Sequence, residues 1–373
     1  MISTDRNIFD PKSAVARRMV EYGSLFDELH IVVFSTKKHG VTDFELSPNC
    51  FVYTVNSDSK FGYIFGAYKI GRQILYKVFF GQTIITTQDP FETGKVGWLL
   101  KRAFKVPLQM QIHTDLFSPY FFQSSPLNAI RVFMARFLLK RTDGIRVVRK
   151  KIADDIIAKL KIPRSKIQVL PILWKKFPTL ATPILSRGVD GKKNILIVSR
   201  LESEKKVDLG LKIFAKVAKG REDLRLVIVG DGSLMNRLQN MAKKLGILDK
   251  VSFEGWREDV ADFYKNAYIF LNTSEYEGFG MSLFESAHSG CAIVTTNVGI
   301  AQDVLGNGRS ALVCPVGDEK CLSTKILNVL ENPLFAQGLS QKAQEDIKKI
   351  TLSKEEYLKQ YKDGLEILLN NPK

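Results

Sequence analysis

Two runs of short apolar segments constrain the fold of this chain more than any other feature. In each run, segments of about six apolar residues alternate with longer stretches that have the period of an amphipathic helix. Buried strands separated by helices are typical of a parallel sheet covered on both faces. Strands are expected at residues 30–35, 50–55, 83–87, 108–113 and 144–148, and then at 193–200, 224–230, 250–255, 268–273 and 291–296. The opening residues "MIST" have the pattern of the tail of one further strand.

The segment between the two runs is predicted to be a linker. Residues 171–190 contain three prolines and have no regular period. Helices are expected after it at 204–220, 233–247, 258–266, 279–289, 318–332, 335–348 and 353–370. The sequence therefore predicts an α/β protein of two doubly wound, Rossmann-like domains facing a central cleft. The predicted boundaries are 1–180, 181–350 and 351–373.

Composition excludes several classes of protein. The 373 residues suit two domains, and 45% apolar with 25% charged residues excludes a wholly disordered chain. No apolar run approaches the roughly 20 residues that span a bilayer, and the first residues show no secretory leader. Reduced thiols in a cytoplasmic protein are expected, because the four cysteines have neither metal-ligand spacing nor a disulfide framework. These cysteines are Cys50, Cys291, Cys314 and Cys321.

Positive charge is concentrated in the first half of the chain. Residues 1–180 hold 28 Lys and Arg against 14 Asp and Glu, whereas the remainder holds 27 against 25. This asymmetry indicates an anionic partner for the first half, either nucleic acid or an acidic membrane surface. Zinc-finger spacing, a basic zipper and an RNA-binding aromatic signature are all missing from the sequence. A membrane surface is therefore favoured, and no nucleic-acid partner is expected.

Basic and aromatic residues alternate in three stretches of this half, and one of them has the pattern of an interfacial helix. On a helical wheel of 126–141, one face is apolar and the cations lie outside it. Such a helix places its apolar side in the headgroup region while its cations meet anionic lipid. A core-facing stripe with a solvated rim is the alternative. The residues proposed for membrane or acceptor contact are Lys69, Arg72, Arg131, Phe133, Arg136, Phe137 and Lys140.

Candidate catalytic residues occur in the segment 274–299, where Glu277 and Glu285 are eight residues apart. The first glutamate is expected in a loop after a strand, and the second lies more than two turns into the helix that follows. Ligands of doubly wound sheets bind at the carboxyl ends of strands, and a helix N-terminus offers unpaired N–H groups to a phosphate. Two carboxylates at this place can hold sugar hydroxyls. The alternative is a loop charge and a solvated helix residue.

Two further segments carry phosphate-binding patterns. Arg200 ends an expected strand and Lys205 opens a helix, so the two cations suit a departing diphosphate. Taken alone, the segment more often indicates a basic loop with Lys205 and Lys206 in solvent. Gly230 and Gly232 form a strand-to-helix turn that resembles a nucleotide loop, although tight packing also requires glycine.

Taken together, these three segments resemble the family 4 retaining glycosyltransferases of the GT-B fold (glycosyl transferases group 1), most strongly over 193–320. The resemblance implies that Arg200 and Lys205 neutralise the diphosphate of a nucleotide-sugar donor. It implies sugar contacts from Glu277 and from the backbone around Gly278, Phe279, Gly280 and Met281, and ribose contacts from Glu285. The nucleotide base, with UDP or GDP as the carrier, is expected near Trp256 and Arg257. The C-terminal helix is expected to cross back to the first domain.

The resemblance is looser in the first half. His113 ends the strand in "QIHTDLF" (111–117), and the resemblance places it near the donor sugar, although a lone strand-end histidine is more often structural. The family's glycine-rich loop is replaced by "TDRNIFDPKSAVARRM" (4–19), which leaves the acceptor side of the diphosphate site without its usual motif.

The expected reaction moves a sugar to a hydroxyl of a lipid-linked or membrane-borne glycan acceptor, in polysaccharide or glycolipid synthesis. The resemblance implies retention of configuration and no metal or other cofactor, since cations of the chain replace Mg²⁺ at the leaving group. The protein is expected to be cytoplasmic and peripheral on the inner face of the cell membrane. Two alternatives stay open: a GT-B epimerase or phosphorylase, and a non-enzymatic basic protein that binds membrane or nucleic acid.

Overall fold

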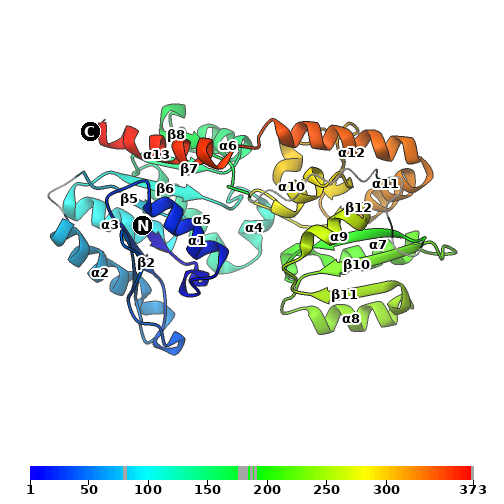
Figure 1. Cartoon of the computed structure of the whole chain (residues 1–373), viewed down its shortest axis with the longest axis horizontal. Helices are drawn as coiled ribbons and strands as arrows, with labels where there is room; N and C mark the ends of the chain where they lie inside the picture. The colour runs from blue at the N-terminus through cyan, green and yellow to red at the C-terminus, as the bar shows by residue number, and fades with distance from the viewer. Residues whose placement is uncertain (79–81, 175–183, 185–187, 189–190, 371–373) are drawn as a thin grey trace. The chain divides into compact units, whose positions relative to one another are not determined.

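The computed structural model describes residues 1–78, 82–174, 184, 188 and 191–370, and the chain divides into two compact units (Figure 1). The first unit contains Met1–Phe117, Ser125–Leu173 and Leu352–Lys373. The second contains Ser118–Ser124 and Trp174–Thr351. Most of the predicted linker, 171–190, lies outside the described residues.

The first unit is built on an eight-stranded sheet with the order β3-β4-β2-β1-β5-β6-β7-β8. All neighbouring strands are parallel except β3, which pairs antiparallel with β4 at the edge. The strands are β1 (Ile2–Ser3), β2 (Leu29–Val33), β3 (Phe44–Ser47), β4 (Cys50–Thr54), β5 (Ile85–Thr87), β6 (Leu108–Ile112), β7 (Gly144–Val147) and β8 (Ile167–Val169). The central strands β5, β6 and β7 are buried along their whole length, as expected for a sheet covered on both faces.

Helices follow the strands of this unit in the predicted alternation. They are α1 (Ala14–Gly23), α2 (Tyr63–Val78), α3 (Glu92–Phe104), α5 (Pro126–Leu139) and α6 (Lys150–Leu160), with a short 3₁₀ turn η1 (Arg6–Phe9). Local sequence sets two of the starts. The Ser13 side chain caps α1 by accepting from Ala16 N, and Ser125 caps α5, with Pro126 at its first position.

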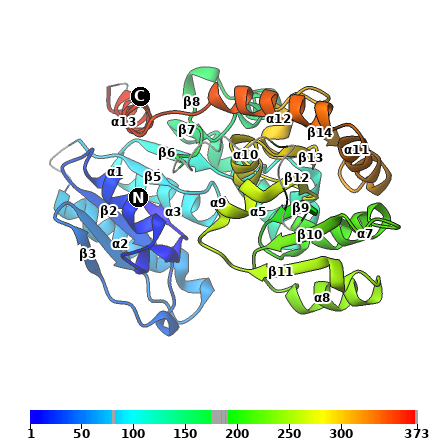
Figure 2. The same ribbon diagram turned by 45° about the vertical axis from the view of Figure 1, so that its right-hand side comes forward.

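The second unit is a six-stranded parallel sheet with the order β11-β10-β9-β12-β13-β14, which can be followed in Figure 2. Counted within the unit, this is the order 3-2-1-4-5-6 of the Rossmann fold. The strands are β9 (Lys193–Val198), β10 (Leu224–Val229), β11 (Val251–Gly255), β12 (Ala267–Asn272), β13 (Ala292–Thr296) and β14 (Leu312–Cys314). The helices are α4 (Pro119–Gln123), α7 (Val207–Val217), α8 (Met235–Lys244), α9 (Val260–Asn266), α10 (Met281–His288), α11 (Glu319–Glu331) and α12 (Pro333–Lys348).

The predicted α/β class with two Rossmann-like domains is confirmed. Each expected strand lies within about three residues of an observed one. Three strands were not predicted: β3, β8 and β14. All three have only three or four residues, and β3 and β8 are interrupted by polar side chains, so their pairing depends on a neighbouring strand already in place.

The C-terminal helix α13 (Lys354–Asn370) packs in the first unit, as predicted. Tyr22 stacks on Tyr361, with ring centroids 4.2 Å apart, and the Gln168 side chain donates to Gln360 O at 2.6 Å. A Cβ on Gly144 of β7 would stand only 2.9 Å from the Leu368 side chain. The last helix therefore shares the core of the sheet formed by the beginning of the chain.

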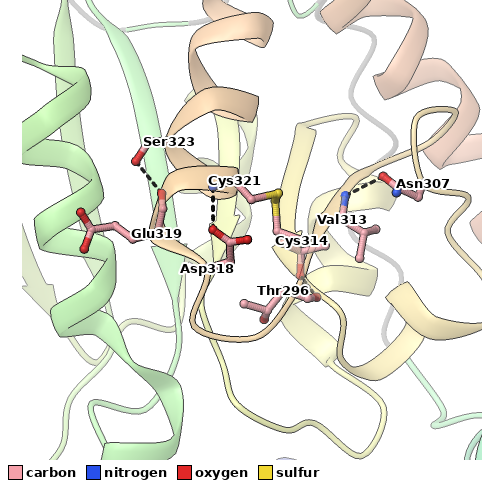
Figure 3. Close-up of a disulfide and its surroundings, with 9 residues drawn as sticks. Thr296, Asn307, Val313, Cys314, Asp318, Glu319, Cys321 and Ser323 are labelled. Atoms are coloured by element: carbon pink, nitrogen blue, oxygen red, sulfur yellow. Dashed lines mark hydrogen bonds between the residues drawn. A yellow bond between two sulfur atoms is a disulfide. The ribbon is translucent and has the colours of Figure 1, made fainter.

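One prediction about cysteines is wrong. Cys314 and Cys321 form a disulfide (Figure 3), whereas reduced thiols were expected for all four. Cys314 ends β14, and a tight turn leads into α11, whose N-cap Asp318 accepts from Cys321 N. The turn brings the two Cα atoms to 5.9 Å, within the range that a disulfide requires. Cys50 and Cys291 are buried thiols.

No helix in the described part of the chain is both long and apolar enough to cross a membrane.

Candidate functional site

Lys205 is held by a turn that the second sheet anchors. It ends a short 3₁₀ segment, η6 (Ser203–Lys205), that follows β9. The Thr273 hydroxyl donates to the carbonyls of both Lys205 and Lys206 at 2.9 Å, and Glu275 N donates to Glu204 O. These bonds join the end of β9 to the end of β12, two neighbouring central strands.

The turn places Lys205 directly against Glu277. The lysine Nζ donates to Glu277 Oε1 at 2.8 Å, and the side chains are only 11% and 16% exposed. Ser274 Oγ also lies 2.9 Å from the same carboxylate oxygen. Glu277 Oε2 has no hydrogen-bond partner among the described residues, so this acid keeps one oxygen available for a ligand.

The loop after Glu277 is supported from behind. The backbone at Gly299 packs closely against this loop, and a Cβ on Gly299 would stand 2.6 Å from Phe279 O and 3.1 Å from Glu277 Cβ. Ile300 N donates to Phe279 O at 2.9 Å. The helix α10 then begins at Met281 with no side-chain cap and no acid in its first turn. Its first N–H groups therefore remain available to an anion.

Glu285 lies on the second turn of the same helix. Tyr264 Oη donates to Glu285 Oε2 at 2.9 Å. Desolvation raises the pKa of Glu285 to about 7, and the hydrogen bond from Tyr264 offsets only part of that rise. The carboxyl therefore changes its charge near neutral pH.

Arg200 belongs to the same strand end but does not touch Glu277. Its side chain is 72% exposed, and the guanidinium pairs with Glu204 at 3.0 Å. An exposed pair of this kind contributes little free energy, so the side chain can turn to another anion at small cost.

The glycine turn after β10 is a packing requirement. Gly230 has φ +136°, and a Cβ there would stand 1.9 Å from Ser199 O. The N–H groups of the turn are already used. Ser233 N and Oγ donate to the Glu202 carboxylate, and these bonds lower the pKa of that acid; Gly232 N donates to Asp231. A donor-binding role for Gly230 and Gly232 stays a prediction.

The residues expected near the base lie after β11. Trp256 is 70% exposed. Arg257 makes a two-pronged ion pair with Asp259, at 2.8 Å and 2.6 Å. No contact joins either residue to Glu277 or Glu285 in the described part of the chain, so their role stays a prediction.

His113 lies in the first unit, directly after β6. Its Nε2 is 3.1 Å from Gln111 Oε1. Desolvation, together with the positive charges of Arg146 and Arg18, lowers the pKa of His113 to about 3, and the ring is uncharged at neutral pH. The residue as a whole is accessible to solvent. Neither arginine is near His113 in the sequence, so its influence could not be predicted.

The apolar face predicted on the helix 126–141 is exposed in the structure. Val132, Ala135, Leu138 and Leu139 of α5 are buried instead. The outward apolar side chains, named here the α5 surface, are Leu127, Ile130, Phe133 and Phe137. The core-facing alternative is therefore wrong for that face.

The cations around the α5 surface differ in their contacts. Arg136 and Lys140 are exposed, and the Arg141 guanidinium lies 3.5 Å from the Phe137 ring centroid. Arg131 instead pairs with Glu92 of α3 at 2.9 Å. On α2, Lys69 is exposed and Arg72 donates to Tyr76 Oη.

In the described ranges, no group of three or more His, Cys, Asp or Glu side chains is arranged to hold a metal ion.

Two doubly wound units, the second with an acid–base pair at the ends of its central strands, define a protein with the architecture of nucleotide-binding α/β enzymes. Two protein-family models match the sequence and together cover more than half of it. Glycosyl transferases group 1 matches residues 184–346, and the Glycosyl transferase 4-like domain matches residues 72–172. The chain belongs to the family 4 glycosyltransferases of the GT-B fold.

Similar proteins agree with this assignment. The alpha-monoglucosyldiacylglycerol synthase of Streptococcus pneumoniae is 31% identical over 227 residues, which are 57% of this chain and 51% of that protein. The chain spans about half, or less, of the length of the first curated relatives that it matches. Sucrose-phosphate synthase from Thermosynechococcus elongatus superposes with a TM-score of 0.80 at 17% identity, covering 99% and 98% of the two chains. HepE from Anabaena, solved with UDP and glucose, gives 0.73 at 16% identity, covering 98% of each chain.

Sequence reasoning missed several residues around the site. Ser274 and Thr273 follow β12 directly, and hydroxyls at a strand end are a signal that the sequence does carry. Tyr264 comes from α9, and Glu202 reaches the turn after β10 from a different loop. No spacing in the sequence indicates either contact.

Proposed function

We propose that this protein transfers a sugar from a nucleoside diphosphate sugar to a hydroxyl of a membrane-borne glycan or lipid acceptor, with retention of anomeric configuration and without a metal ion. The observation that carries the proposal is the pair formed by Lys205 and Glu277. A largely shielded ammonium and a carboxylate with one oxygen unpaired among the described residues lie side by side at the ends of β9 and β12, close to the uncapped start of α10. The two groups match adjacent parts of one ligand, a diphosphate and the sugar attached to it.

The proposed roles follow from this geometry. Lys205 has two further protons for the diphosphate, and Arg200 leaves its weak pair with Glu204 to join it. The N–H groups of Gly280 and Met281 add partial positive charge. Together these groups stabilise the charge that develops on the leaving phosphate, which is the role assigned to Mg²⁺ in metal-dependent transferases.

The remaining donor contacts are assigned to carboxylates and to the base site. Glu277 Oε2 accepts from hydroxyls of the transferred sugar, and ionised Glu285 accepts from the ribose hydroxyls. Trp256 and Arg257 flank the base, and UDP is the carrier proposed first because the similar HepE structure contains it.

The transfer step needs no covalent nucleophile. The bond between the anomeric carbon and the phosphate oxygen breaks, and the acceptor oxygen bonds to the same face of that carbon. The departing phosphate takes the proton of the acceptor hydroxyl. Substitution from the same face leaves the anomeric configuration unchanged.

A membrane-borne acceptor is supported by the first unit. The α5 surface exposes four large apolar side chains beside Arg136, Lys140 and Arg141. Trp98 of α3 meets Phe137 edge to face, and Arg102 lies over the Trp98 ring, so aromatic and basic groups continue onto the neighbouring helix. This charge complements an anionic lipid surface, and the apolar side chains suit its headgroup boundary. The S. pneumoniae relative is named for a glycolipid product.

The proposed use of a nucleotide-sugar donor is tested by measuring nucleotide binding and by analysing the products. Calorimetry with UDP and GDP should detect one of them, whereas a non-enzymatic basic protein would bind neither. Incubation with a panel of nucleotide sugars, with and without lipid extract, should release the nucleoside diphosphate only as sugar is transferred or hydrolysed. Appearance of an epimerised nucleotide sugar, or a requirement for inorganic phosphate, would assign the chain to one of the other two GT-B activities.

The proposed binding to an anionic membrane is tested by flotation with vesicles of phosphatidylcholine alone or mixed with phosphatidylglycerol. Binding should require the anionic lipid and should weaken as salt is raised. Equal binding to both vesicles, or none, would remove the membrane surface from the proposal.

A further inference from the structure

Beneath His113 lies a buried polar network that neither the proposed donor site nor the family resemblance uses. It joins Gln111 of β6, Arg146 of β7 and Tyr357 of α13. The parallel register of the sheet sets Gln111 directly beside Arg146. All three residues are at most 3% exposed. Burying an arginine in a sheet is costly unless its donors are used, so the network needs an explanation.

The hydrogen bonds of the network fix the orientation of the Gln111 amide. Arg146 Nη1 lies 2.8 Å from one atom of that amide, and an arginine has only donors. The facing atom is therefore the carbonyl oxygen, Oε1. The amide nitrogen then points the other way and donates to Thr86 Oγ1 at 3.0 Å.

The orientation of Gln111 in turn fixes the proton on His113. The same oxygen, Oε1, lies 3.1 Å from His113 Nε2, and an oxygen that only accepts needs a proton on that nitrogen. Nδ1 then carries a lone pair, and it has no hydrogen-bond partner within the described residues.

The C-terminal helix holds the arginine in place. Arg146 Nη2 donates to Tyr357 Oη at 2.6 Å, and Tyr22 Oη lies 2.7 Å from Tyr357 Oη. The guanidinium also lies over the rings of Tyr357 and Tyr361, at 5.6 Å and 5.3 Å. The tautomer of His113 therefore depends on a contact between residues more than 200 positions apart in the sequence.

We infer that Arg146, held by Tyr357, is a positioning residue that acts through Gln111 to keep His113 protonated on Nε2, so that Nδ1 meets a ligand only as a hydrogen-bond acceptor. This role in turnover rests on the proposed function. It sets a selection rule for any group that reaches His113, because an acceptor nitrogen binds a hydroxyl or an amide N–H and rejects a carbonyl or carboxylate oxygen. The lowered pKa of His113 is consistent with the inference, since a charged ring would donate from both nitrogens.

The tautomer is directly measurable, because the chain has only four histidines. The full-length protein is labelled with ¹⁵N in the imidazole rings, and the His113 signals are assigned by their loss in His113→Asn. We expect the shifts of an Nε2–H tautomer that do not change between pH 5 and pH 8. An Nδ1–H tautomer, or titration near the ordinary histidine pKa, would overturn the inference.

Variants test the path of the effect. Gln111→Glu keeps an acceptor toward Nε2 but adds negative charge, so His113 should titrate within the measured pH range while its neutral form keeps the same tautomer. Arg146→Met should lower kcat/KM for the donor about tenfold, the loss of one hydrogen bond, and Arg146→Lys should restore part of it. Unchanged His113 signals in both Gln111→Glu and Arg146→Met would contradict the relay.

Controls separate this relay from a general disturbance of the unit. Tyr53→Phe removes the hydroxyl 3.1 Å from His30 Nδ1 and should alter only the His30 signals. If Arg146→Met does not fold, Tyr357→Phe supplies a milder change at the same arginine. The NMR measurement does not depend on whether the protein transfers a sugar. An Nδ1–H tautomer of His113 would therefore reject this inference alone, and the absence of sugar transfer would reject only the proposed function.

Discussion

The two units share one architecture and use it differently. In the second unit the strand ends carry the chemistry, and Lys205, Glu277 and Glu285 come from segments whose spacing is visible in the sequence. In the first unit the helices carry the excess positive charge, and the polar groups of the sheet are buried beneath His113. The comparison shows that functional side chains at the ends of parallel strands come from short segments with a recognisable sequence motif. Side chains on a helix face, or in a buried contact between strands, have no such motif in the sequence.

The largest effect is expected when the ion pair between Lys205 and Glu277 in the second unit is broken. Glu277→Gln keeps the size of the side chain but removes the charge that faces Lys205. Sugar transfer should fall about 10²- to 10³-fold, the range for one lost electrostatic contact in a transition state. The measurement is kcat/KM for the nucleotide sugar.

A matched control lies two residues away. Glu275 pairs with Lys206 at 3.1 Å in the same turn. Glu275→Gln should change kcat/KM less than about twofold, because its partly exposed pair with Lys206 contributes little free energy. Equal losses in the two variants would show that the turn as a whole matters and the Glu277 carboxylate does not.

The second prediction concerns the packing beneath the site. Gly230→Ala places a Cβ 1.9 Å from Ser199 O, a backbone atom that cannot move alone, and should destabilise the second unit by about 3 kcal/mol. Hydrogen exchange of the β9 and β10 amides in urea reports this loss, with β2 and β6 amides as the reference in the first unit. Gly246→Ala is the control, since its φ is +67° but nothing lies within 4 Å; it should cost about 1 kcal/mol.

The third prediction is a pH dependence of donor binding. Because the pKa of Glu285 is raised to about 7, the carboxyl is protonated below that pH and loses acceptor capacity. Affinity for UDP-glucose, measured by calorimetry, should fall up to about tenfold per pH unit below 7 and level off above it. Glu285→Gln should remove the dependence, and a slope that persists in this variant would assign it to another group.

The same shift affects stability with a defined sign. The folded protein binds the Glu285 proton more tightly than the unfolded chain, whose carboxyl has a pKa near 4.5. The free energy of unfolding should therefore decrease as pH rises from about 4.5 to about 7 and change little from this group outside that window.

The smallest effect is expected on the surface of the first unit. Phe133 of α5 is 78% exposed, and Leu334 of α12 in the second unit is 80% exposed. Phe133→Ser should weaken binding to anionic vesicles several-fold, whereas Leu334→Ser should leave it unchanged. Neither should alter the free energy of unfolding by more than about 0.5 kcal/mol. A loss of vesicle binding in both variants would remove the contrast between the units.

The central strands of the two sheets could be predicted from the sequence, whereas most of their edge strands could not. The central strands were predicted because a continuous apolar run of five or six residues indicates a buried parallel strand. The edge strands β3 and β14 were missed because they have only four and three residues, and segments this short pair only where a neighbouring strand offers its backbone. The disulfide was missed because seven residues of sequence separation say nothing about the tight turn between β14 and α11.

The sequence by itself determined the two parallel α/β units, the uneven distribution of charge and the segments that supply Lys205, Glu277 and Glu285. These follow from local patterns, because the period of burial and the residues at strand ends are properties of short stretches of chain. Only the tertiary structure decided that Lys205 touches Glu277, that burial beside Tyr264 raises the pKa of Glu285, and that Arg146 reaches Tyr357 across 211 positions. Contacts of that kind depend on sheet register and helix docking, which the whole core fixes at once.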